Sequence, residues 1–297
     1  MIVLAVLGGV LSGCASPEAT RAGTAVLPTA PEKPAAASSS PSRAPSRAPS
    51  RPVESDPPVL APGPGGLTPV FERRATGSTG RDGAGAADKV VALTFDADMT
   101  ADQGQRAAGG ERFDNPGLIA SLRRLEVPST VFMTGRWAQE YPDQARSIGT
   151  DPLFEIANHS FSHHAFSSPC YGLPTVAAED MRADVERAFT AIRRTGARHV
   201  VPYFRFPGGC YDDASLKALA PTGVTAVQWD VVSGDAFATD ADAVAEQVLE
   251  RVRPGSLVVM HCTRSAAPVT DDALRRIVPE LRERGYRFVK VSELMRG

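Results

Sequence analysis

From residue 88 onward, short apolar runs rich in β-branched residues alternate with longer stretches in which apolar residues recur every three or four positions. The first pattern predicts strands and the second predicts helices, which together indicate repeated βα units around a mainly parallel sheet. We expect strands over residues 90–95, 129–133, 153–157, 199–206, 225–229, 256–261 and 286–289. We expect helices over residues 116–126, 176–195, 240–253 and 271–284.

These elements predict a single α/β domain over residues 88–297. About seven strands joined by short connections within ~210 residues favour a distorted, incomplete (β/α) barrel of parallel strands over two separate domains. A doubly wound open sheet is the alternative architecture. In both, functional side chains gather beyond the carboxyl ends of the strands, so those ends are where we expect the chemistry.

The residues before this domain have a different composition. Residues 2–11 are apolar and uncharged, and Ser12, Gly13 and Cys14 follow, which is typical of a secretory signal and its cleavage site. Residues 11–14 (LSGC) also resemble a bacterial lipobox, although no Lys or Arg precedes the apolar run. We therefore expect residues 1–14 to be a signal peptide with a lipobox and Cys14 to carry lipid, with plain secretion as the alternative. Both place the protein outside the cytoplasm, lipid-anchored at the outer face of the cell membrane or secreted.

The segment between the signal and the domain is rich in Pro, Ala and Ser. Residues 15–66 contain no aromatic side chain, and residues 77–87 continue the same loose character. Such a segment buries too little apolar surface to offset the entropy of ordering it. We therefore expect residues 15–87 to be a disordered linker.

Charge and length exclude two broad classes of protein. The 297 residues include 32 basic and 34 acidic side chains, for a net charge of −2. That balance gives no electrostatic footprint for nucleic acid. No apolar run approaches the ~20 residues that a membrane-spanning helix requires. We therefore expect the protein to attach to a membrane only through the lipid on Cys14. We also expect the chain to be a monomer.

Polar residues suited to metal binding and acid–base chemistry follow most of the expected strands. Asp is common in turns, a Gly pair can be only a tight turn, and two histidines four residues apart are more often incidental than metal ligands. What indicates a site is that all of them leave the same edge of one sheet. The candidates are Asp96, Asp98, His159, His163, Arg205, Gly208, Gly209, Trp229, Asp235 and His261.

The ordered series TFDAD, HSFSH, RFPGG, WDVVSGD and LVVMH resembles the five motifs of the polysaccharide deacetylase family (carbohydrate esterase family 4, the NodB-like domain). The resemblance covers essentially residues 89–297 and implies a distorted barrel of about seven strands. It also implies hydrolytic removal of acetyl groups from an extracellular or envelope polysaccharide, such as peptidoglycan or chitin oligomers. The implied cofactor is a divalent metal, Zn²⁺ first, with Co²⁺ or Ni²⁺ as alternatives.

The resemblance further implies a role for each matching residue. Asp96 would be the general base oriented by Arg205, and His261 the general acid supported by Asp235. His159 and His163 would bind the metal. The backbone of Gly208 and Gly209 would face the oxyanion, and Trp229 would line the substrate site.

Three positions depart from the family pattern. Ala97 stands where the family has its metal-binding aspartate, so Asp98 is the expected third ligand unless that ligand is missing. Ala236 replaces a tryptophan, and the aromatic wall is then lost or supplied by Phe237. Cys262 stands where an aspartate is frequent. Two other functions therefore stay open: a catalytically impaired glycan-binding lipoprotein, and an acetyl xylan esterase on the same scaffold.

If Cys14 carries lipid, three cysteines remain, and all three follow motif loops. Cys262 lies at a strand end beside the expected acid, where a bridge would constrain the imidazole. Cys170 and Cys210 lie in longer loops that are freer to reach the Cα separation of ~5.5 Å that a disulfide prefers. We expect a Cys170–Cys210 disulfide and a buried, reduced Cys262, the alternative being three unpaired thiols.

Overall fold

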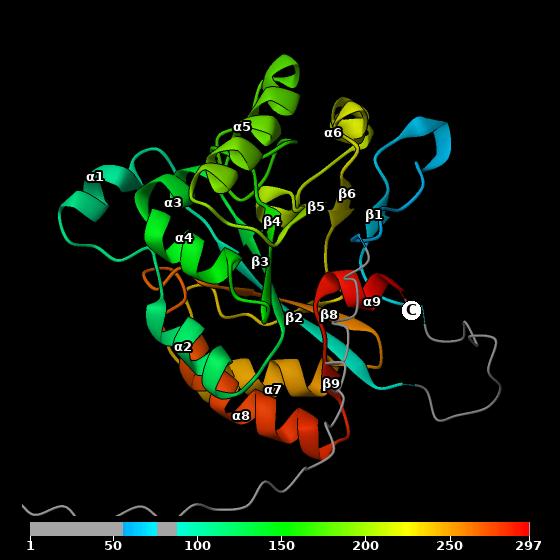
Figure 1. Cartoon of the computed structure of the whole chain (residues 1–297). Helices are drawn as coiled ribbons and strands as arrows, with labels where there is room; N and C mark the ends of the chain where they lie inside the picture. Colours follow the sequence, from blue (N-terminus) through cyan, green and yellow to red (C-terminus); the bar gives the residue numbers. More distant parts are fainter. Residues whose placement is uncertain (1–55, 76–87, 297) are drawn as a thin grey trace, which may run out of the picture. The chain divides into compact units, whose positions relative to one another are not determined.

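The structure, a computed structural model, describes residues 56–75 and 88–296 (Figure 1). The expected signal segment, residues 1–14 with Cys14, and the expected linker over residues 15–55 and 76–87 lie outside the described residues. The described part folds as one α/β unit in which helices pack against the outside of a curled parallel sheet. None of its helices is both long enough and apolar enough to cross a membrane.

The sheet follows the order β1-β6-β5-β4-β3-β2-β8-β7, and β9 pairs with the start of β2. Every pairing is parallel. β1 and β7 stand at the two ends without pairing to each other, so the barrel is incomplete, as the sequence predicts. The strands are β1 (Val70–Phe71), β2 (Val90–Ala97), β3 (Ser129–Met133), β4 (Phe154–Asn158), β5 (Val200–Phe204), β6 (Thr225–Val227), β7 (Val231–Val232), β8 (Ser256–His261) and β9 (Arg287–Phe288).

The four helices expected from apolar periodicity all form, and shorter ones join them. Short 3-10 turns occur as well, one of which, Ala178–Asp180, leads directly into α5. The shorter helices have six to eight residues, too few turns to show a clear period of 3.6. The helices are α1 (Gln103–Ala108), α2 (Pro116–Arg124), α3 (Gly135–Glu140), α4 (Pro142–Gly149), α5 (Met181–Arg194), α6 (Asp213–Leu219), α7 (Ala241–Arg251), α8 (Thr270–Glu283) and α9 (Val291–Arg296).

Strand β2 explains how the barrel positions its polar residues. Both of its faces are buried, which is why the strand is an almost continuous apolar run. Alternate residues such as Leu93 and Phe95 pack outward against the helices, whereas Val90 and Ala92 pack inward with Phe132 of β3. The same alternation sets the direction of each side chain at the carboxyl end of the strand.

The expected linker, residues 15–87, is wrong for the stretch 56–75. Val70 and Phe71 form β1, which pairs with β6, and the Thr68 hydroxyl donates to the backbone carbonyl of Leu216 at 2.8 Å. Leu67 and Val70 also pack against buried residues of the domain. These few apolar residues are ordered because they pair with the edge of the sheet. The linker prediction rests on average composition, which does not reveal such a tertiary contact.

Candidate active site

Asp96 near the end of β2 and Asp98 just beyond it both face the same two histidines. Asp96 pairs in register with Phe132, an inward residue, while Ala97 pairs with Met133 and belongs to the outer core. Asp98 follows the last residue of β2, and its Oδ2 lies 3.6 Å from His163 Nε2, so its side chain also faces the histidines. The backbone N–H of Asp98 donates to Thr263 Oγ1 at 3.2 Å, and the same hydroxyl donates to Asp98 Oδ1.

Asp96 is held by a buried arginine. Arg205 Nη1 donates to Asp96 Oδ1 at 2.7 Å, and Arg205 Nε donates to the carbonyl of Val227 at 3.1 Å. The guanidinium lies over the Phe132 ring at 3.8 Å and has no exposed surface. Burial lowers the pKa of Arg205, and the charge of Asp96 acts in the opposite direction. The pair therefore fixes one carboxylate oxygen and leaves Asp96 Oδ2 facing the site.

The two histidines lie on a loop tied down from several sides. The backbone N–H of His159 donates to the Met133 carbonyl at 3.0 Å, and the backbone N–H of His163 donates to Ser160 Oγ at 2.8 Å. His159 Nδ1 lies 3.0 Å from the Arg205 carbonyl, which can only accept, so Nδ1 carries the proton. The lone pair of His159 is then on Nε2, the arrangement common in metal-binding histidines.

Both imidazoles face carboxylates. His159 Nε2 lies 3.6 Å from Asp96 Oδ2, and His163 Nε2 lies 3.6 Å from Asp98 Oδ2. Burial lowers the pKa of His159, and it lowers that of His163 to about 4 despite nearby carboxylates, so both rings are neutral at pH 7. Burial alone would raise the pKa of Asp98, but His163, His261 and the Thr263 hydroxyl lower it.

Two neutral imidazole nitrogens and one carboxylate make a donor set suited to a divalent metal such as Zn²⁺. Within residues 56–75 and 88–296, however, no three such side chains are already drawn together as a complete metal site. The donor atoms of His159, His163 and Asp98 fit such a metal by their chemistry, and His163 Nε2 faces Asp98 Oδ2.

His261 at the end of β8 forms a charged pair with Asp235. His261 Nδ1 donates to Asp235 Oδ1 at 2.8 Å, and the His261 backbone N–H donates to Oδ2 at 2.7 Å. Burial alone would lower the pKa of His261, but the charge and hydrogen bond of Asp235, with Asp96 and Asp98, raise it to about 9. Burial likewise would raise the pKa of Asp235, but His261 lowers it. The His261 side chain is therefore protonated, as an imidazolium, at neutral pH.

The turn after β5 requires its glycines. Gly208 and Gly209 have φ values of 65° and 71°, and a Cβ on Gly209 would lie 2.6 Å from the Trp229 ring. The Gly209 N–H already donates to the Phe206 carbonyl at 2.9 Å, which corrects the expectation that both glycine amides face the oxyanion. Trp229 is half-buried, 5.4 Å from the Arg205 guanidinium.

A disulfide joins Cys170 to Cys210, with a Cα–Cα distance of 6.0 Å, and Cys262 is reduced and buried. This is the pairing expected from the loops. Burial raises the pKa of the Cys262 thiol to about 12, so it is not a nucleophile at neutral pH. The disulfide fastens the loop that follows His163 to the turn after β5.

Several supporting residues were not identified from the sequence. Thr263 holds Asp98, and the Thr270 hydroxyl donates to Asp235 Oδ2 at 2.7 Å. Ser233 Oγ donates to Asp235 Oδ1 at 2.9 Å. Their only signal is a hydroxyl within a few positions of a motif residue, which is too common to single them out.

The chain has recognisable relatives. A family model described as Polysaccharide deacetylase matches residues 83–227. The chain is 30% identical over 216 residues to the chitooligosaccharide deacetylase of Sinorhizobium fredii, covering 69% of this chain and 91% of that protein. It is 26% identical over 211 residues to a peptidoglycan-N-acetylglucosamine deacetylase of Bacillus cereus, covering 70% and 89%.

Solved structures share the fold. One is a mutant of BA3943, a carbohydrate esterase family 4 pseudoenzyme from Bacillus anthracis, with restored enzymatic activity. It aligns with a TM-score of 0.58 and 24% sequence identity over 76% of this chain and 70% of that one.

Proposed function

Because this chain belongs to the polysaccharide deacetylase family, we propose that it hydrolyses N-acetyl groups on an N-acetylglucosamine-type glycan, such as peptidoglycan or chitin oligomers, with the help of a divalent metal. One observation carries the proposal. A carboxylate fixed by an arginine and an imidazolium fixed by a carboxylate both border the two neutral histidines, with Asp96 of β2 in register with His261 of β8.

We assign the metal to His159 Nε2, His163 Nε2 and Asp98. Zn²⁺ suits these ligands best, and Co²⁺ or Ni²⁺ would also accept them. When bound, the metal supplies a Lewis acid that polarises the acetyl carbonyl. The Asp98 carboxylate would replace the family aspartate at position 97, and its Oδ2 lies 3.6 Å from His163 Nε2.

Asp96 acts as the general base and His261 as the general acid. Asp96 Oδ2 takes a proton from the attacking water, and Arg205 keeps the carboxylate in place. The water oxygen bonds to the acetyl carbon and the C–N bond breaks, while the imidazolium of His261 delivers its proton to the departing amine nitrogen. The products are acetate and a free glucosamine amine. The Gly208 amide contributes to oxyanion binding, and Trp229 borders the sugar.

We also propose that lipid on Cys14 anchors the enzyme at the outer face of the membrane, where residues 15–55 would let it reach the glycan. The support is the apolar run and LSGC tetrad at residues 2–14. Labelling cells with a palmitate analogue tests this. The parent should incorporate label and Cys14→Ser should not. Equal labelling of the two would contradict lipid attachment at Cys14.

Position 97 favours a second candidate, a glycan-binding lipoprotein without turnover. Ala97 cannot ligate a metal, and if Asp98 fails to replace it the site keeps only its histidines. An acetyl xylan esterase is a third candidate, since the same side chains would hydrolyse an O-acetyl ester. Zinc stoichiometry distinguishes the deacetylase, which should bind zinc, from the glycan-binding lipoprotein, which should not. Acetate release from acetylated xylan would identify the esterase.

The test of the proposed enzyme combines metal content with turnover. After saturation with Zn²⁺ and desalting, the parent and Asp96→Asn should both retain zinc, and His159→Ala should not. Asp96→Asn should lose turnover because its amide cannot take a proton. Asp143→Asn, whose side chain is exposed on α4, is the matched control. Full activity in Asp96→Asn would contradict the mechanism.

A further inference from the structure

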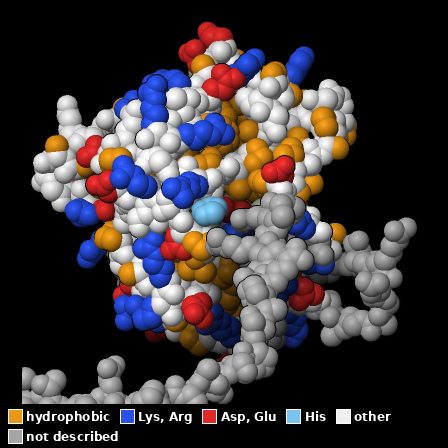
Figure 2. All heavy atoms as spheres, in the orientation of Figure 1, with side chains coloured by type: hydrophobic (Ala, Val, Ile, Leu, Met, Phe, Trp, Pro, Cys, Tyr) orange, Lys and Arg blue, Asp and Glu red, His pale blue; other side chains and the backbone are white. Residues whose placement is uncertain are grey.

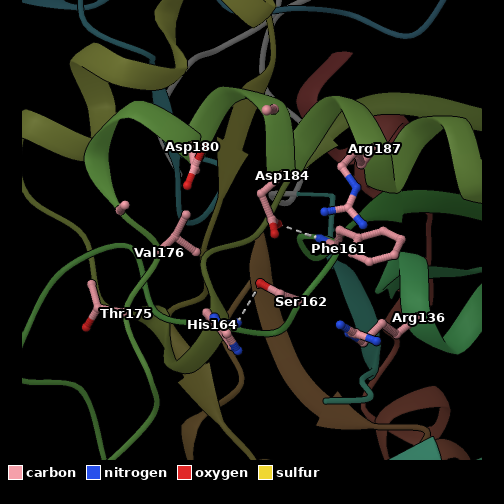
Figure 3. A pocket seen from close by; sticks show the side chains of 11 residues that line it. Arg136, Phe161, Ser162, His164, Thr175, Val176, Asp180, Asp184 and Arg187 are labelled. Carbon is pink, nitrogen blue, oxygen red and sulfur yellow. Dashed lines mark hydrogen bonds between the residues drawn. The ribbon is translucent and has the colours of Figure 1, made fainter. Parts of the chain in front are cut away.

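A hollow lies beside the loop that carries His159 and His163 (Figure 3). Its volume is about 430 Å³, and its walls come from that loop, from α3 and from α5. Ser162 and His164, the two neighbours of His163, both line it. A ligand in this hollow would therefore lie beside the proposed metal site.

One end of the hollow is built from two arginines around one aromatic ring. The Arg187 guanidinium lies 3.9 Å from the Phe161 ring centroid, and the Arg136 guanidinium lies 5.3 Å from it. Neither makes an ion pair with a carboxylate of the described residues, whereas Arg182 on the same helix pairs with Glu186 at 2.6 Å. Arg136 Nε is buried without a hydrogen-bond partner in this part of the chain.

The hollow is also lined by two acidic side chains, Asp180 and Asp184. Asp180 ends the 3-10 turn before α5 and lies on the side away from Arg136, whereas Asp184 of α5 lies beside Phe161 (Figure 3). Asp184 is buried, and its Oδ1 accepts the backbone N–H of Phe161 at 2.6 Å. That carboxylate is therefore committed to holding the loop. Figure 2 shows Lys and Arg side chains gathered around a histidine on the face of the molecule that Figure 1 presents.

Guanidinium groups stacked on a ring keep their N–H edges free for a carboxylate. We propose that the end formed by Arg136, Phe161 and Arg187 binds a carboxylate carried by the glycan substrate. The inference rests on the proposed function and narrows its substrate. The preferred glycan would be an acidic one, in which N-acetylglucosamine alternates with a carboxylate-bearing acetylated sugar, over a neutral chitin oligomer.

Backbone hydrogen bonds connect the start of α3 to the loop that carries the histidines. The backbone N–H of Gly135 donates to the Ser160 carbonyl at 3.0 Å, and that of Arg136 donates to the Phe161 carbonyl at 3.2 Å. The start of α3 therefore holds both the histidine loop and one of the two arginines. A carboxylate bound at Arg136 would fix the neighbouring acetylated sugar relative to His163.

The test measures binding rather than turnover. Calorimetric titration of the full chain, kept metal-free with a chelator, would compare three probes. They are an oligosaccharide of alternating N-acetylglucosamine and N-acetylmuramic acid, the same compound with its carboxylates converted to methylamides, and an N-acetylglucosamine tetramer. The parent should bind the free carboxylate roughly three- to tenfold more tightly than either neutral probe, the range of a partly exposed charge pair.

Arg187→Met keeps an apolar stem on Phe161 and removes the charge, and it should abolish this preference. Arg136→Met should do the same. Arg194→Ala, an exposed arginine at the end of α5, should keep the preference and controls for net charge. Equal affinity of the parent for the acid and its methylamide would overturn the inference, as would a preference that survives in the double Met variant. A preserved preference without acetate release would contradict the proposed function and leave this inference standing.

Discussion

Replacing Asp235 with Asn removes the charge behind the proposed acid while keeping its size. Asp235 is 1% exposed, and its Oδ1 lies 2.8 Å from His261 Nδ1. Without that charge, burial should bring the pKa of His261 from about 9 toward its ordinary value of 6.5. The difference corresponds to roughly 3 kcal/mol, the net of burial, which lowers the pKa, and of Asp235, Asp96 and Asp98, which raise it.

The pH dependence of kcat/KM for acetate release measures this change. The donor is the imidazolium, so the rate is full below the pKa of His261 and falls as the pH rises through it. The alkaline limb should move to lower pH in Asp235→Asn. A bound cation would offset the charge of Asp98 and so lower the pKa of His261 in the parent and in Asp235→Asn alike. The difference in pH between the two alkaline limbs would therefore remain. The exposed Asp272→Asn is the control, and an alkaline limb at the same pH in Asp235→Asn would refute the reasoning.

The same pair makes stability depend on pH. His261 has a raised pKa in the folded state, so its contribution is fully present below about pH 6.5 and is lost as the pH rises through about 9. Chemical denaturation at pH 6 and pH 9.5 should show this loss in the parent. Asp235→Asn should show little of it.

Other side chains give further tests. Asp98→Ala should weaken zinc retention at least tenfold in a chelator competition, since a metal ligand is lost, and unchanged retention would assign the third ligand elsewhere. Replacing Cys170 and Cys210 by Ser should lower the free energy of unfolding by about 2–4 kcal/mol, because the bridge closes a loop with a sequence separation of 40. Gly209→Ala should lower the melting temperature and change Trp229 fluorescence, because its Cβ would meet that ring at 2.6 Å; an unshifted emission spectrum would contradict the packing.

The fold follows from the sequence where elements are long or strongly patterned. The expected strands at 90–95, 129–133 and 256–261 correspond to β2, β3 and β8, because buried parallel strands are apolar on both faces. β1 and β7 have two residues each, and pairing with a neighbouring strand rather than local preference decides them. That is why residues 56–75 were expected to be linker.

The site divides in the same way. The inward direction of Asp96 follows from the period of a strand, which a sequence displays, whereas that of Asp98 depends on its contacts with Thr263 and His163. The proton on His159 Nδ1 depends on the Arg205 carbonyl, and so on the placement of β4 beside β5. No spacing along the chain reports such a contact. Arg136 and Arg187 likewise meet only through Phe161, which lies between α3 and α5.

Acetate release from N-acetylated glycans by the full chain tests the central claim most directly. With Zn²⁺ added, the parent should liberate acetate from N-acetylglucosamine oligomers or peptidoglycan fragments, and a chelator should stop it. His261→Ala should lose most of this activity because the departing amine has no proton donor. No acetate from any of these glycans, with zinc demonstrably bound, would contradict the account and leave a glycan-binding protein in its place.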